Sequence, residues 1–224
     1  MVPVAVPEMK ASQNLRHYSF KHSLSEGKWD LRFDGDFQGL PERAERDNYF
    51  KLSPPAQEDF LKKSFEASHK DWVVKKTQVL DATSLRKPLG LSVTAEREYE
   101  DGRRIEIPPF PGMPSALYIP DDLAPTRQVP ISFTYAFTQK AEATITLPEG
   151  FKLIPVSGMD QENFFGRVRW EAKPDPASPG TVRVIFEVEL AERTANEHAY
   201  ATLLQFFGWL REAQRRSVII ERVS

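Results

Sequence analysis

Apolar and polar residues alternate over much of the chain, which predicts β-strands. A period of two buries one face of a strand and leaves the other in water. The first such segment has apolar residues at Tyr18, Phe20 and Leu24. A second run follows at 29–37, after a short link that contains Gly27. Two alternating runs joined by such a link predict a β-hairpin.

The same pattern returns along the rest of the chain. We expect further extended segments at 72–80, 90–99, 129–137, 143–147, 168–172, 182–190 and 217–223. Asp101-Gly102 separates Tyr99 from Ile105, and this turn dipeptide predicts a second hairpin.

Two segments have helical spacing instead. Ser53-Pro54 is typical of an N-cap followed by proline at the first helical position, which predicts a helix over 54–68. Asn196 is a plausible N-cap for a helix over 197–215. Its apolar stripe follows the helical period, at Tyr200, Leu203, Leu204, Phe207 and Leu210. The charged segment 41–50 favours a short third helix.

Proline divides the chain at one internal place. Six prolines lie within residues 108–125, and each removes a backbone donor, so this segment predicts a surface crossing. It is the one plausible internal boundary. Pro3 and Pro7 interrupt the apolar start of the chain, so we expect an extended lead-in over residues 1–13. Residues 14–224 then form one large domain, with a possible subdivision at 108–125.

About a dozen short strands and two packed helices indicate a mainly β protein. The pattern favours an antiparallel β-sandwich of the jelly-roll type, with helices at about 54–68 and 197–215. Sandwiches of 200 or more residues can form a single domain.

Composition narrows the functional classes. The 224 residues carry 30 basic and 32 acidic side chains, for a formal net charge of -2. This balance supplies no global field that favours nucleic acid or an anionic membrane. There are no cysteines, which excludes disulfides, thiolate metal sites and a cysteine nucleophile. No apolar run reaches the length of a membrane-spanning helix, and no signal peptide is apparent.

Candidates for a reactive or metal site are few. His17 and His22 are an odd number of residues apart on a strand, so they point to opposite faces and cannot share a metal without a bulge. Asp34 and Asp36 put two carboxylates on one strand face. They could bind calcium or act as an acid/base pair, but the rest of an EF-hand loop is absent, and a solvated strand face explains both aspartates more simply. Asp121-Asp122 in the crossing is interpreted as a turn or cap. We therefore assign no catalytic, cofactor-binding or metal-ligating residue.

Charged and aromatic clusters also have two interpretations. Arg167, Arg169 and Arg183, with Lys75-Lys76, could form an anion surface, but interleaved glutamates favour cross-strand charge pairs. Exposed aromatic rings could bind a partner or a sugar. The candidates are Phe206, Phe207 and Trp209 for a partner, and Trp29, Trp72, Trp170 and Trp209 for a sugar. Burial in the core is the competing interpretation.

The order of several motifs resembles a known family. A G-x-W-x-L-R-F-x-G-D-F-x-G arm spans Gly27 to Gly39, and Leu147-Pro148-Glu149-Gly150-Phe151 and Asn163-Phe164-Phe165-Gly166 follow. A helix with Glu197, Tyr200 and Phe207 closes the series. In this order they resemble the C-terminal region of bacterial transglutaminase-like proteins, over about residues 7–223. There, β-rich regions of unknown function flank a papain-like core with a Cys-His-Asp triad.

The resemblance implies a non-catalytic accessory or interaction domain. No position here matches the triad, so no site residue or cofactor is carried over. The implied partner is a preceding transglutaminase-like core of the same polypeptide, or another protein. The family also implies an extracytoplasmic location. The alternatives are a carbohydrate-binding β-sandwich and an enzyme that uses Asp34 and Asp36.

Overall fold

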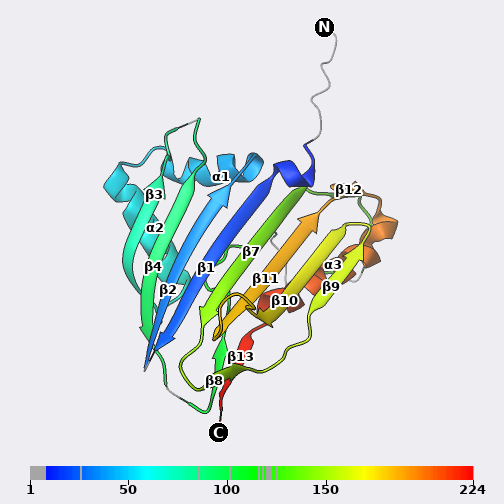
Figure 1. Ribbon diagram of the computed structural model, residues 1–224. Coiled ribbons are helices and arrows are strands. Elements are labelled where there is room, and N and C mark those ends of the chain that lie inside the picture. The colour runs from blue at the N-terminus through cyan, green and yellow to red at the C-terminus, as the bar shows by residue number, and fades with distance from the viewer. Residues whose placement is uncertain are drawn as a thin grey trace.

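The computed structural model describes residues 9–223 except 26, 85, 101, 116, 118, 120–122 and 125. The mainly β class is confirmed (Figure 1). The strands are β1 Leu15–Ser25, β2 Lys28–Phe37, β3 Val73–Leu80, β4 Gly90–Glu98, β5 Arg104–Ile107, β6 Ile131–Ser132, β7 Phe137–Thr146, β8 Phe151–Leu153, β9 Met159–Asn163, β10 Gly166–Pro174, β11 Thr181–Leu190, β12 Thr194–Ala195 and β13 Val218–Arg222. The helices are α1 Leu40–Tyr49, α2 Pro54–Ser68 and α3 Tyr200–Arg215, with short 3-10 turns at Ala11–Gln13 and Glu197–Ala199.

One large sheet dominates the fold. Its eight strands run in the order β3-β4-β2-β1-β7-β11-β10-β9. The β1–β7 pair is parallel, with Phe20 opposite Ala143, whereas the other neighbours are antiparallel. The expectation of a purely antiparallel sheet is therefore wrong at its centre. These two strands are far apart in the chain, so no tight turn restricts their relative direction.

The alternation gives the large sheet one buried and one open face. The side chains on its buried face include Tyr18, Phe20, Leu31, Val93, Ala143, Val184 and Trp170. The open face carries charged side chains and is turned toward the viewer in Figure 1, with α2 and α3 behind the sheet. The sequence pattern thus assigns the faces correctly.

The buried face is covered by a mixed layer. Helices α2 and α3 and the small sheet β5-β13-β8 contribute apolar side chains to the same core. Phe110 and Met113 of the proline-rich crossing also pack there, and Pro109 and Pro111 are buried. The crossing therefore runs over the apolar face rather than along the outside of the protein. A sandwich of two comparable sheets, or a jelly roll, is not confirmed.

The sequence predicted neighbouring elements more accurately than it predicted which distant strands pair. The β1–β2 hairpin is confirmed, with Phe20 opposite Phe33. The hairpin expected around Asp101-Gly102 is wrong, because β4 pairs with β2 and β3 whereas β5 pairs with β13. The expected strand over 129–137 is also wrong: β6 covers two residues, and β7 begins at Phe137. Regular alternation indicates which residues are buried without indicating which strand is adjacent.

The helices agree closely with expectation. Helix α2 has the predicted bounds, and α3 follows a 3-10 turn at Glu197–Ala199 within the predicted 197–215. The favoured short helix is α1, so there are three α-helices rather than two. Asn14 is fully buried, and its amide donates to the Ala136 carbonyl at 2.8 Å while its oxygen accepts from the Leu40 amide at 3.0 Å. This side chain fixes the start of α1 against the start of β7.

The domain assignment remains a prediction. Residues 1–8 of the expected lead-in lie outside the described residues, and its described part contains the 3-10 turn Ala11–Gln13. The Asp121-Asp122 turn also lies outside them. Strands from both sides of the crossing share the large sheet. Among the described residues, none of the helices combines the length and the hydropathy needed to cross a bilayer.

Candidate functional site

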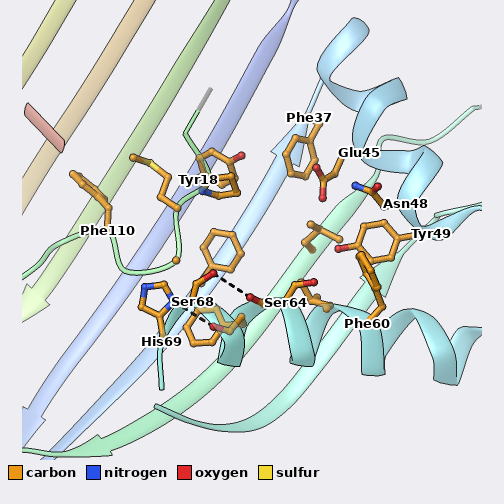
Figure 2. Close-up of a pocket in the computed structure, with 17 residues that line it drawn as sticks. Tyr18, Phe37, Glu45, Asn48, Tyr49, Phe60, Ser64, Ser68, His69 and Phe110 are labelled. Carbon is orange, nitrogen blue, oxygen red and sulfur yellow. Dashed lines mark hydrogen bonds between the residues drawn. The ribbon is translucent and has the colours of Figure 1, made fainter. Parts of the chain in front are cut away.

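A cavity of about 480 Å³ opens between the buried face of the sheet and helices α1 and α2 (Figure 2). Ligand sites commonly fall in the range of about 300–1,000 Å³. Its walls come from strands β1, β2 and β4, from α1 and α2, and from the proline-rich crossing. The lining residues are Tyr18, Phe33, Phe37, Glu45, Asn48, Tyr49, Phe60, Leu61, Ser64, Phe65, Ser68, His69, Leu91, Phe110, Gly112, Met113 and Pro114.

Helical periodicity brings the polar lining residues together. Glu45, Asn48 and Tyr49 are spaced i, i+3 and i+4 along α1, which places them on one face. On α2 the facing stripe is Leu61, Ser64, Phe65, Ser68 and His69. Figure 2 shows the α1 group at one end of the cavity and Ser68 and His69 toward the other, with Phe110 across from them.

The crossing closes one side of the cavity. Gly112 has a positive φ of 77°, and a Cβ built there lies 2.9 Å from the ring of Phe65. A larger residue would therefore collide with α2. The close approach brings Phe110 and Met113 into the cavity wall.

The α1 end combines a carboxylate with two buried phenols. Burial raises the pKa of Glu45, and the nearby Arg16 guanidinium and a hydrogen bond to Asn48 oppose this effect. Tyr18 and Tyr49 are 1% and 2% exposed. Burial raises the pKa of both phenols, and the charge of Glu45 raises each further. Both tyrosines therefore stay neutral and contribute aromatic surface and hydroxyl groups.

The opposite end is polar but uncharged near neutral pH. Burial lowers the pKa of His69, and its Nδ1 lies 3.3 Å from the carbonyl of Phe65. The Ser68 hydroxyl donates to the Ser64 carbonyl at 3.3 Å. Among the described residues that line the cavity, Glu45 is the one carboxylate, and no lysine or arginine occurs. The cavity is thus aromatic and apolar with a single anionic end.

A second polar cluster lies outside the cavity. His22 is 2% exposed, its Nδ1 accepts from the Trp29 indole at 3.0 Å, and its Nε2 donates to the Pro109 carbonyl at 2.8 Å. Burial lowers the pKa of His22 to about 4. Arg97 stacks over Trp29 at 3.9 Å and over Trp72 at 5.0 Å. This neutral histidine ties the crossing to the sheet, and the prediction that His17 and His22 face opposite sides is confirmed.

Asp34 and Asp36 lie on the open face, away from the cavity. Asp34 accepts from the Arg32 guanidinium at 2.9 Å and from the Ser92 hydroxyl at 2.7 Å. Asp36 lies 3.9 Å from Nδ1 of His17. The described part of the chain contains no group of three or more histidine, aspartate or glutamate side chains that could hold a metal ion.

The charged and aromatic clusters have structural partners. Arg167 pairs with Asp160 at 2.6 Å and Arg183 with Glu142 at 2.7 Å across neighbouring strands. Arg169 pairs with Glu171 on its own strand at 3.0 Å, and Lys75 pairs with Glu96 at 2.6 Å. Cross-strand charge pairing is confirmed for Arg167 and Arg183, although their partners are not the interleaved glutamates, and it is wrong for Arg169, which pairs along its own strand. Burial of the aromatic clusters is confirmed at Phe206, Phe207, Trp29, Trp72 and Trp170, while Trp209 is half-buried.

Sequence reasoning missed the cavity. Its one usable signal is the run of polar Ser64 and Ser68 on the same helical stripe as buried Leu61 and Phe65. Ser64 and Ser68 are exposed although they lie beside buried Leu61 and Phe65, and such a mixed stripe indicates a helix face that is only partly packed. Glu45 has no comparable signal, because α1 is charged on several sides.

Comparison with known proteins gives one match. A family model described as "Domain of Unknown Function with solved-structure structure (DUF3858)" matches residues 103–220. No curated protein and no solved structure matches the chain. The matched segment runs from β5 to β13 and contributes Phe110, Gly112, Met113 and Pro114 to the cavity. The other lining residues precede it.

Proposed function

The chain belongs to the DUF3858 family of domains of unknown function, and on that premise we propose that it is a non-catalytic accessory domain. In this proposal it follows a transglutaminase-like core in a larger bacterial protein and contacts that core or another protein. The order of the motifs between Gly27 and Phe207 supports the placement. The absence of cysteine from the sequence means that the nucleophile of such a core has to come from outside this chain.

The observation that carries the proposal is that the candidate reactive side chains are engaged in framework contacts. His22 bridges Trp29 and the Pro109 carbonyl. Asp34 is held by Arg32 and Ser92 on the opposite face of the sheet. The other candidate carboxylate, Asp36, lies on the same open face 3.9 Å from Nδ1 of His17. A general acid/base pair has to be free to exchange protons with a substrate, and Asp34 is already held by two donors.

The open face supports the same assignment. Several of its arginines and lysines pair with carboxylates on the same or neighbouring strands, as in Arg183–Glu142 and Lys140–Glu187. Such internal pairing leaves no uncompensated basic stripe for nucleic acid. The small sheet β5-β13-β8 facing the large one is, in this proposal, the second layer of a reduced sandwich.

The carbohydrate alternative has less support. Sugar platforms need exposed indole rings, and Trp29, Trp72 and Trp170 are at most 5% exposed. Half-buried Trp209 packs against the core. We therefore prefer the accessory domain.

The test begins with the reading frame upstream of Met1, where we expect an in-frame core with a Cys-His-Asp triad. That core and this chain are then purified separately and mixed. We expect a complex in sedimentation velocity at micromolar concentrations, and an altered rate of amine incorporation into a glutamine peptide relative to the core alone. Failure to form a complex, together with an unchanged rate, contradicts the proposal. Amine incorporation catalysed by this chain alone contradicts its non-catalytic part.

A further inference from the structure

The cavity between α1, α2 and the sheet has a charge distribution that favours cationic over anionic ligands. Glu45 is the single carboxylate among its described lining residues, and no lysine or arginine lines it. His69 at the far end is kept neutral by burial. An anionic ligand would meet the Glu45 carboxylate without a compensating cation in the wall. A cationic ligand would find a counter-ion.

Arg16 is the cation that acts on Glu45 from the protein itself. It lowers the pKa of that carboxyl, but burial has the larger effect and raises it. The Arg16 guanidinium donates to the Tyr135 hydroxyl at 3.5 Å, and Arg16 does not line the cavity. On the cavity side, Glu45 is hydrogen-bonded to Asn48, and a carboxylate has further acceptor positions for another donor.

Aromatic side chains line the cavity together with the carboxylate: Tyr18, Tyr49 and Phe60. The charge of Glu45 raises the pKa of both tyrosines, and Phe60 packs edge-on against Tyr49 at 5.5 Å. Aromatic faces attract a cation, and a charge-assisted hydrogen bond to a carboxylate is stronger than a neutral one. Asn48 contributes an amide at the same end.

Between the anionic end and the polar end with Ser64, Ser68 and His69, the cavity walls are apolar. Phe33, Leu61, Leu91 and Met113 form walls without charge. The volume of about 480 Å³ exceeds that of a lone ammonium ion and admits a chain of several methylene groups. The shape therefore suits a charge carried at the end of an alkyl stem.

We propose that this cavity binds a primary alkylammonium group. Glu45 and Asn48 accept its N–H donors, the rings of Tyr18 and Tyr49 face the charge, and the apolar wall holds the alkyl stem. The group can come from a lysine side chain of a peptide or from a free alkylamine. This site is independent of the accessory role and remains if no transglutaminase-like core exists.

The test is calorimetric titration of the whole chain with n-butylammonium at neutral pH, with n-butanol as the uncharged ligand of similar shape. We expect butylammonium to bind and butanol to bind at least about tenfold more weakly, a difference of about 1.4 kcal/mol. Nα-acetyl-lysine amide and spermidine distinguish the two sources, since the tighter ligand identifies which one the cavity prefers. No binding of any amine, or equal affinity for butanol, overturns the proposal.

Two variants distinguish the effect of the Glu45 charge on binding from a general effect of removing a charge from the protein. Glu45→Gln keeps the shape of the side chain and should weaken butylammonium binding about tenfold or more. Glu58→Gln removes the same charge from the exposed surface of α2 outside the cavity, and should leave binding unchanged. Equal affinity of the Glu45→Gln and wild-type proteins overturns the assignment of Glu45.

A pH series gives a readout that needs no variant. Protonation of Glu45 competes with the ammonium group, so affinity should fall as the pH is lowered through the pKa of this carboxyl. The other titratable or charged groups near it are Arg16, Tyr18 and Tyr49, of which the two phenols stay neutral over that range, and His69 at the far end. Affinity that does not change with pH down to acid denaturation contradicts the proposal.

Discussion

The two halves of the large sheet differ in what they bury. The N-terminal half consists of β3, β4, β2 and β1 with α1 and α2, and its core is aromatic: Tyr18, Phe20, Trp29, Phe33, Phe37, Tyr49, Phe65 and Trp72. The C-terminal half consists of β7, β11, β10 and β9 with α3. Its sheet residues are mainly aliphatic: Ala141, Ala143, Ile145, Val168, Val182, Val184, Val188 and Leu190.

The halves also differ in their buried ionisable groups. His22 and Arg46 are buried in the N-terminal half, and the anionic end of the cavity lies there. In the described part of the C-terminal half, no histidine, carboxylate, lysine or arginine is buried, and the polar residues Thr138 and Gln139 carry no charge. We therefore expect the C-terminal half to be sensitive to changes in side-chain volume, and the N-terminal half to be sensitive to pH and, under our proposal, to cationic ligands. The family model matches residues 103–220, which include the strands of the C-terminal half. It reaches the cavity of the N-terminal half only through Phe110, Gly112, Met113 and Pro114.

The largest expected effect on stability comes from shortening one buried side chain in the C-terminal half. Phe206 on α3 is fully buried, so Phe206→Ala should lower the free energy of unfolding by about 3–5 kcal/mol. Phe60→Ala at the cavity rim is the matched change, because Phe60 is 40% exposed. It should cost about 1 kcal/mol or less. Urea unfolding measures both, and equal losses would contradict the distinction between framework and cavity wall.

A smaller loss of stability is expected when the pH is lowered, and unfolding should then begin in the N-terminal half. The pKa of His22 is about 4 in the folded protein and 6.5 when unperturbed. The unfolded chain therefore binds more protons between these values. Stability should be complete above pH 6.5, fall by about 3 kcal/mol as the pH drops from 6.5 to 4, and stay level below that for this group.

Urea midpoints across this pH range test the expectation, with His22→Gln as the control without a titrating ring. Subtracting the two profiles removes the contributions of His17, His69 and His198. Hydrogen exchange near pH 5 should show amides of β1 and β2 losing protection before those of β10 and β11. Identical pH profiles for the wild type and the variant would show that His22 does not titrate on unfolding.

The smallest effect is expected on the open face. Asp34→Asn combined with Asp36→Asn should change the free energy of unfolding by about 1 kcal/mol or less, because exposed ion pairs contribute little. Calcium should leave the melting temperature of the wild type unchanged. A saturable increase with calcium that the double variant lacks would instead establish a calcium site at these aspartates.

Sequence alone predicted the elements that depend on local spacing. Helix α2 and the β1–β2 hairpin follow from a cap, a turn and a period within one segment. The parallel β1–β7 pair and the pairing of β5 with β13 were not predicted. Alternating residues satisfy any partner strand that buries the same face, so the period does not distinguish among them.

The candidate site was less predictable than the fold. Its walls come from six separate elements between Tyr18 and Pro114. The burial of Glu45 depends on how α1 is held against the sheet, which Asn14 determines through bonds to Ala136 and Leu40. None of these relations has a local signature. His22 was weighed as a metal ligand, and only its contacts with Trp29 and Pro109 reveal its framework role.

The sequence by itself determined that this chain forms strands with one apolar and one polar face, and that it supplies no thiol group. Those properties are local, since they depend on residue type and on a spacing of two or four positions. The tertiary structure decided which strands are adjacent. It also decided that Phe110 and Met113 of the proline-rich segment pack into the covering layer, and that a cavity with one anionic end lies beside α1. Pairing and empty space depend on distances between residues far apart in the chain, which no short-range pattern encodes.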